Sequence, residues 1–196
     1  MFLIQPLTMT GRIVRLEPLQ EAHVPDLCRV GLDPEIWRWM LYGDIDSEDK
    51  MRGFVRLLLE WQGIGETLPF AVIHLGEGRA IGCTRYMELA PEHLGLEIGG
   101  TWYGKAYQRT GVNSECKYLL LRLAFEVYGC IRVQLKTDRN NLRSQAAIER
   151  LGAVKEGVLR NHMLRPDGTV RDTVYYSILD REWPEVKERL ERMMQT

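Results

Sequence analysis

The sequence lacks the features that mark secreted, membrane or nucleic-acid-binding proteins. Its 196 residues carry a formal net charge of -1, so no positive field favours nucleic acid. No apolar run approaches the roughly 18 residues that a membrane-spanning helix needs. The apolar start, residues 1–4, follows no basic segment and runs into Gln5 and Pro6, which predicts that it is not a signal peptide. We therefore expect neither a membrane nor a nucleic-acid partner.

Paired cysteines and metal-ligand motifs are also missing. The four cysteines are scattered in apolar contexts and form no C-x-x-C pair, which is typical of buried free thiols in a reducing compartment. The four histidines show no H-x-x-x-H spacing, so the sequence predicts no metal site. These observations predict a cytoplasmic protein.

What is present indicates one globular domain over residues 1–196. Apolar residues make up 45% and charged residues 27% of the chain, a balance typical of soluble domains of this length. No internal repeat, low-complexity tract or linker divides the chain.

The hydrophobic periodicity predicts a mixed α/β domain rather than a regular βαβ repeat. Helices are expected over residues 21–32, from Ser47 onward, over 112–128 and 141–151, and after a cap at Asp180. Strands are expected over residues 12–18, 70–75, 80–89, 95–103, 131–137, 153–164 and 169–179.

The most informative segment is the turn between the strand over 95–103 and the long apolar helix. Backbone N–H groups exposed at such a helix start bind phosphate, and Gly111 permits close approach of the backbone or a positive φ. Neither G-x-G-x-x-G nor G-x-x-x-x-G-K-[ST] occurs, which disfavours a dinucleotide site and a P-loop. An ordinary capped helix start remains an alternative. The turn comprises Gln108, Arg109, Thr110, Gly111, Val112, Asn113 and Ser114.

A second helix start follows the next strand along the chain. Asn141 suits the N-cap of the helix over 141–151, and Ser144 stands three residues later. Capping alone explains Asn141. However, two helix starts that follow two neighbouring strands can open onto the same edge of a sheet, which favours a shared binding site.

These segments together resemble the GNAT superfamily of acetyltransferases, and most closely its branch of RimJ- and RimL-like ribosomal-protein N-acetyltransferases. The resemblance rests on Leu96-Glu97-Ile98-Gly99, Gln108-x-x-Gly111-x-Asn113, Asn141-x-x-Ser144 and Leu151-Gly152-Ala153. It implies a GNAT fold, a largely antiparallel sheet with a splayed strand pair and flanking helices. It also implies that acetyl-CoA binds with its pyrophosphate on the Gln108–Ser114 turn and its pantetheine arm near Asn141, between residues 95–102 and 131–137.

Two positions depart from the family pattern. Asn113 stands where glycine or alanine is usual, and we expect the turn to survive because asparagine tolerates unusual backbone angles. Ile148 stands where many relatives carry a tyrosine that acts as general acid. The branch that this sequence resembles has a serine for that role, and Ser144 matches it.

The chemistry implied is direct attack of an amine on the thioester. Glu97 is the candidate base, because burial in mid-strand would raise its pKa; the alternative is a structural ion pair with an arginine such as Arg85. Ser144 would donate a hydrogen bond to the departing sulfur, and backbone N–H groups around Gly99 to Trp102 would stabilise the oxyanion.

The acceptor is not named by the sequence. The acceptor could be a peptide N-terminus, a polyamine, an amino acid or an aminoglycoside. Whether the protein forms a homodimer is also open. Aromatic residues between 37 and 42 either cover the acceptor cleft or belong to the core, and Tyr86 and Glu88 are expected to flank that cleft. Two other classes stay open: an acyl-CoA-binding sensor with weak catalysis, and an unrelated nucleotide-binding domain.

Overall fold

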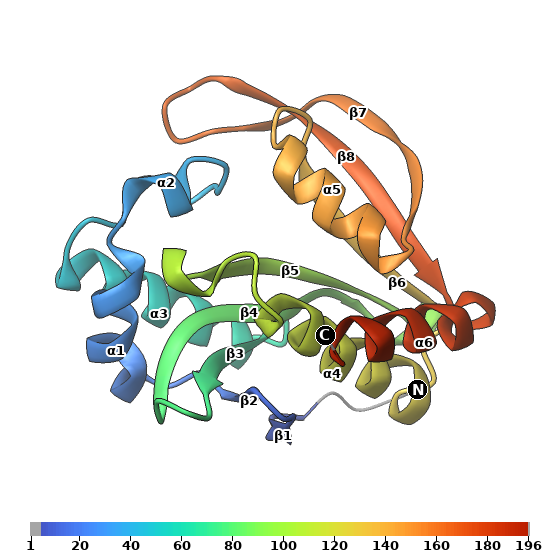
Figure 1. The fold of residues 1–196 in the computed structure, drawn as a ribbon. Helices are drawn as coiled ribbons and strands as arrows, with labels where there is room; N and C mark the ends of the chain where they lie inside the picture. The colour runs from blue at the N-terminus through green and yellow to red at the C-terminus, as the bar shows by residue number, and fades with distance from the viewer. Residues whose placement is uncertain (1–4, 196) are drawn as a thin grey trace.

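A twisted eight-stranded sheet runs through the computed structural model, which describes residues 5–195 (Figure 1). The strand order is β1-β2-β3-β4-β5-β6-β8-β7, and every neighbouring pair is antiparallel except β5 and β6. The strands are β1 (Met9–Thr10), β2 (Val14–Pro18), β3 (Thr67–His74), β4 (Arg79–Ala90), β5 (Gly95–Tyr103), β6 (Arg132–Asp138), β7 (Val154–Leu164) and β8 (Val170–Leu179). The mixed α/β fold with a largely antiparallel sheet, expected from the sequence, is confirmed.

Helices cover both faces of the sheet. The α-helices are α1 (Val24–Gly31), α2 (Pro34–Trp37), α3 (Glu48–Gly63), α4 (Val112–Arg122), α5 (Leu142–Leu151) and α6 (Trp183–Met193). One apolar cluster joins α1 and α3 to inward-facing residues of β3 and β4. A larger cluster joins α4, α5 and α6 to the other side of the sheet.

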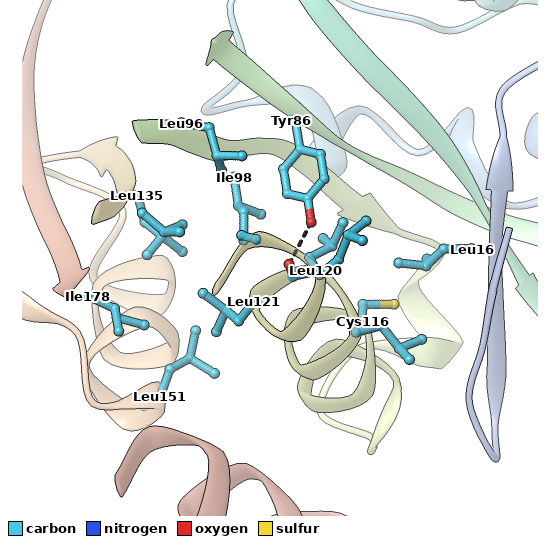
Figure 2. Packing of buried hydrophobic residues seen from close by; sticks show 14 of the residues in the cluster. Leu16, Tyr86, Leu96, Ile98, Cys116, Leu120, Leu121, Leu135, Leu151 and Ile178 are labelled. Atoms are coloured by element: carbon cyan, nitrogen blue, oxygen red, sulfur yellow. Dashed lines mark hydrogen bonds between the residues drawn. The ribbon is translucent and has the colours of Figure 1, made fainter. Parts of the chain in front are cut away.

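The larger cluster is built around α4, which is buried on most of its surface. Figure 2 shows Leu120 and Leu121 of α4 facing Ile98 of β5 and Tyr86 of β4. The Tyr86 hydroxyl donates a hydrogen bond to the carbonyl oxygen of Leu120. Tyr86 therefore belongs to the core, and the expectation that it flanks the acceptor cleft is wrong.

Strands β5 and β6 pair over only three positions, Gly95–Glu97 with Arg132–Gln134. Beyond them β5 stays with β4, while β6 continues along β8 as far as Asp138. In Figure 1, β5 and the β7–β8 hairpin accordingly separate toward the side on which α2 lies. The two strands thus part toward their carboxyl ends, where α4 and α5 begin.

Several element boundaries differ from the sequence prediction for local reasons. The long helix is α-helical only to Arg122 and continues as a π-turn over Leu123–Val127. The expected cap at Asp180 is wrong: a 3₁₀ turn precedes α6, and the Glu182 carboxylate accepts the Leu179 N–H at 2.9 Å. Ser47 does cap α3, accepting from the Lys50 N–H. The prediction that residues 1–4 are not a signal peptide concerns a segment outside the described residues.

Candidate active site

A bulge in β5 shapes the middle of the splayed strand pair. Arg85 of β4 pairs with Gly99 and Cys83 pairs with Trp102, so β5 has one residue more than β4 between these pairs. Gly100 takes a left-handed conformation, with φ of 56°, that glycine adopts without a steric penalty. Gly100 and Thr101 have no partner in the register between β4 and β5, and they lie in the segment expected to stabilise an oxyanion.

The turn over 108–114 follows β5 and leads directly into α4. Its left-handed residue is Arg109, with φ of 62°, whereas Gly111 is right-handed with φ of -65°. The glycine at position 111 instead lets the turn pack closely against Ile13, since a Cβ atom there would lie 3.0 Å from Cδ1 of Ile13. The Thr110 hydroxyl donates to the Tyr107 carbonyl and accepts from the Val112 N–H.

The first turn of α4 has unpaired backbone donors. Within residues 5–195, the N–H groups of Asn113 and Ser114 make no hydrogen bond, as is usual at a helix start. Val112 and Ser114 bury their side chains, so only their backbones could meet a ligand. Asn113 sits in the helix, and its side-chain oxygen accepts from the Tyr103 hydroxyl at 3.2 Å. Free donors at a helix N-terminus fit a pyrophosphate.

A direct contact joins the two helix starts that the sequence placed at one edge. The Arg143 guanidinium in the first turn of α5 donates to Oε1 of Gln108 at 2.7 Å, and Gln108 Nε2 donates to the Tyr103 carbonyl. Asn141 caps α5 through the Ser144 N–H at 3.1 Å. The Ser144 side chain is half-buried, and its hydroxyl has no partner among the described residues.

Glu97 occupies the last paired position of β5 before the splay and is 1% exposed. Its Oε2 atom accepts from Gln134 Nε2 at 2.9 Å and lies 3.1 Å from the Lys136 Nζ. The alternative prediction, a structural ion pair between Glu97 and Arg85, is wrong. The partner comes from β6 because Glu97 pairs there with Gln134, two residues before Lys136.

Burial raises the pKa of Glu97 above its ordinary value, although Lys136 and Gln134 act in the opposite direction. Burial alone would lower the pKa of Lys136, but the Glu97 and Glu88 carboxylates raise it. Glu88 also pairs with Lys136 and is more exposed. The site therefore holds one buried carboxylate of enhanced basicity beside a firmly charged ammonium.

Sequence reasoning missed a buried lysine behind the bulge. Lys117 of α4 is 6% exposed and donates to the Thr101 hydroxyl at 2.7 Å, which in turn bonds the Thr84 hydroxyl at 2.8 Å. Burial lowers the pKa of Lys117 to about 8. The available signal was a lone lysine among apolar residues on a helix otherwise expected to be buried.

The aromatic residues expected near the acceptor cleft divide between two roles. Trp37 is a core residue, 2% exposed, and its ring packs against Trp102. Tyr42 instead lies beside the Arg85 guanidinium, and both its hydroxyl and its ring contact that group. Ile148 is buried in the core, so no side chain reaches the cleft from that position of α5.

Neither a metal site nor a membrane-spanning helix is found within residues 5–195. In the part of the chain that the structure describes, no cluster of three or more His, Cys, Asp or Glu side chains could hold a metal ion. No helix among the described residues is long and apolar enough to cross a bilayer.

The splayed strand pair, with two linked helix starts at its open edge, is the arrangement that the resemblance to acyl-CoA-dependent acetyltransferases implies. The chain belongs to the GNAT acetyltransferase family and is an acyl-CoA-dependent N-acetyltransferase. The family model described as "Acetyltransferase (GNAT) domain" matches residues 14–154.

Similar proteins agree with this assignment. The uncharacterized N-acetyltransferase p20 of Bacillus licheniformis is 24% identical over 174 residues, covering 87% of this chain and 93% of p20. A solved acetyltransferase structure from T. thermophilus is 42% identical with a TM-score of 0.89, covering 97% of this chain and 98% of that one. Mycobacterium smegmatis RimJ, solved with CoA-disulfide, shares the fold at 20% identity and a TM-score of 0.76, covering 91% of this chain and 88% of RimJ.

Proposed function

We propose that this enzyme transfers an acetyl group from acetyl-CoA to a primary amine by direct attack, within one cytoplasmic domain. The observation that carries the proposal is the position of Glu97. Its buried carboxylate lies at the last paired position of β5 and β6. There the strands begin to separate toward the two linked helix starts.

The residues present fit CoA at the turn. Unpaired N–H groups of Asn113 and Ser114 point out of the positive end of α4, where they would hold the pyrophosphate. The exposed Arg109 adds positive charge beside them, and Gly111 keeps the turn close to Ile13. Asn141 would meet the pantetheine arm from the adjacent helix start. When bound, acetyl-CoA supplies an activated acyl group.

The protein groups then divide three tasks. Glu97, of raised pKa, would accept the proton of the incoming ammonium directly or through one water. Backbone N–H groups at the Gly99–Trp102 bulge would stabilise negative charge on the thioester oxygen. The free Ser144 hydroxyl would donate to the departing sulfur, whose thiolate, with a pKa of about 8.5, needs no stronger acid.

The test is acetyl-CoA turnover against a panel of amines, amino acids and peptides, read by the release of free thiol. Gly111→Val should abolish CoA binding while the fold remains intact, because a branched side chain crowds the turn. Gly157→Val is the matched control, since a Cβ atom at Gly157 meets nothing within 4 Å. Unchanged CoA affinity in Gly111→Val would contradict the site. CoA binding without turnover of any amine would favour an acyl-CoA sensor.

A further inference from the structure

Arg85 stands on the same face of the sheet as Glu97. It pairs with Gly99 across β4 and β5, and Glu97 lies two residues before Gly99 on β5. Side chains two residues apart on one strand share a face, and directly paired residues point to the same side. A Cβ atom on Gly100 would lie 3.0 Å from Nε of Arg85, so the guanidinium also underlies the bulge. Arg85 therefore adjoins the proposed reaction centre.

The charge on Arg85 has no counter-ion among the described residues. The side chain is 5% exposed, and no carboxylate of residues 5–195 approaches its nitrogens within 4.0 Å. Its Nη2 atom donates to the Tyr42 hydroxyl, while Nε and Nη1 are buried without a hydrogen-bond partner. The rings of Tyr42 and Trp61 cover the group at 5.6 and 5.3 Å from their centroids.

The neighbouring groups cannot neutralise this charge. Glu97 and Glu88 are both engaged by Lys136, and Lys117 behind the bulge adds a further cation without a carboxylate partner among the described residues. Burying an arginine with two of its three guanidinium nitrogens unpaired is costly, and an apolar side chain such as methionine would avoid that cost. The arrangement is explained if an anion completes the site when substrate binds.

We propose that the acceptor amine carries a carboxylate, which Arg85 binds while Glu97 faces the amine. This rests on the proposed N-acetyltransferase function and names its substrate class. A carboxylate can accept a charge-assisted hydrogen bond from Nε or Nη1, the two guanidinium nitrogens that have no partner among the described residues. Glu97 and Arg85 are diagonal neighbours on β5 and β4, whose residues lie about 7 Å apart at the backbone, so both side chains can reach one small amine.

The test compares matched acceptors that differ only in the carboxylate. We would measure kcat/KM for leucine and phenylalanine, for their amides, and for the corresponding decarboxylated amines, with acetyl-CoA saturating. The acid should exceed its amide by at least about tenfold, as expected for one charge-assisted contact. In Arg85→Met the ratio of acid to amide should fall to about one, and Arg85→Lys should restore part of it. Arg56→Met, an exposed arginine on α3, is the control and should keep the ratio.

Each other outcome counts against the assignment. Equal rates for acid and amide, a ratio that survives in Arg85→Met, or a preference for phosphoethanolamine over the amino acids would overturn it. Thermal shifts with leucine and leucinamide, recorded in the presence of CoA, separate this proposal from the proposed function. The proposal expects leucine, but not leucinamide, to raise the melting temperature. If Arg85→Lys keeps this thermal shift and Arg85→Met loses it, the anion site is supported even if no acceptor is acetylated. No difference between leucine and leucinamide contradicts the anion site even if other amines are acetylated.

Discussion

Two glutamates are almost completely buried in this protein, and they are held in opposite ways. Glu115 of α4, 2% exposed, accepts the backbone N–H groups of Arg12, Ile13 and Val14, each at 2.7 Å. Glu97 of β5, 1% exposed, is held by the side chains of Gln134 and Lys136 and by no other group within residues 5–195.

The difference shows how the fold separates a structural carboxylate from a reactive one. Three backbone donors cannot move away from Glu115 without unfolding the turn between β1 and β2, so that carboxylate is fixed in place. The partners of Glu97 are side chains of β6, which can reorient at the edge of the splay. A carboxylate with a raised pKa and adjustable partners is suited to proton transfer.

The largest effect on stability is expected from Glu115→Gln. The amide has one acceptor where the carboxylate has two, so at least one buried N–H of Arg12, Ile13 or Val14 loses its partner. Leaving a buried donor of a charged hydrogen bond unpaired costs about 3 kcal/mol. Urea unfolding measures this loss, with Glu126→Gln on the exposed side of the π-turn as control. A loss below about 1 kcal/mol would erase the distinction between the two glutamates.

Lys117→Met should stabilise the protein in a manner that depends on pH. The folded pKa of Lys117 is about 8 against 10.5 for the free group, so between these values the unfolded state binds more protons and stability rises with pH. Below pH 8 the folded protein bears the full cost of burying the Lys117 charge. This cost is on the order of 3 kcal/mol and is reduced by the hydrogen bond to Thr101. The variant should be the more stable near pH 7, with a difference that shrinks from pH 8 to 10. A constant difference would contradict the lowered pKa.

Ser144→Ala should give the smallest effect of the series. The cap of α5 uses the Ser144 N–H and the Asn141 side chain, so stability should stay within about 0.5 kcal/mol. If the hydroxyl donates to the leaving sulfur, single-turnover transfer should slow by about tenfold with CoA affinity unchanged. Asn141→Ala is the contrast, since it removes the cap and should cost about 1 kcal/mol. Transfer at the wild-type rate would make Ser144 a helix residue only.

The parts of the site that the sequence predicted are those set by neighbouring residues. The turn before α4, the Asn141 cap and the placement of Glu97 in mid-strand each follow from a few consecutive residues. Lys117 and Glu115 were not predicted as buried ionic groups, and Arg85 was predicted with the wrong partner, because their roles depend on contacts 16 or more positions away. The predicted ionic partner of Glu97 was wrong for the same reason. Strand β5 lies between β4 and β6, and the hydrophobic periodicity does not show which of these two strands supplies the partner.

The most direct test of the account is the pH profile of kcat/KM for wild type and Glu97→Gln, measured with one amine acceptor from the panel. Glu88→Gln is the matched control, because Glu88 shares Lys136 but is not buried. We predict that Glu97→Gln lowers kcat/KM by about 10²-fold or more at pH 7, as for loss of a general base, with unchanged CoA affinity. The gap should narrow as pH rises and the free amine becomes abundant. A loss that is uniform at every pH, or no loss, would contradict the role of Glu97 as the base.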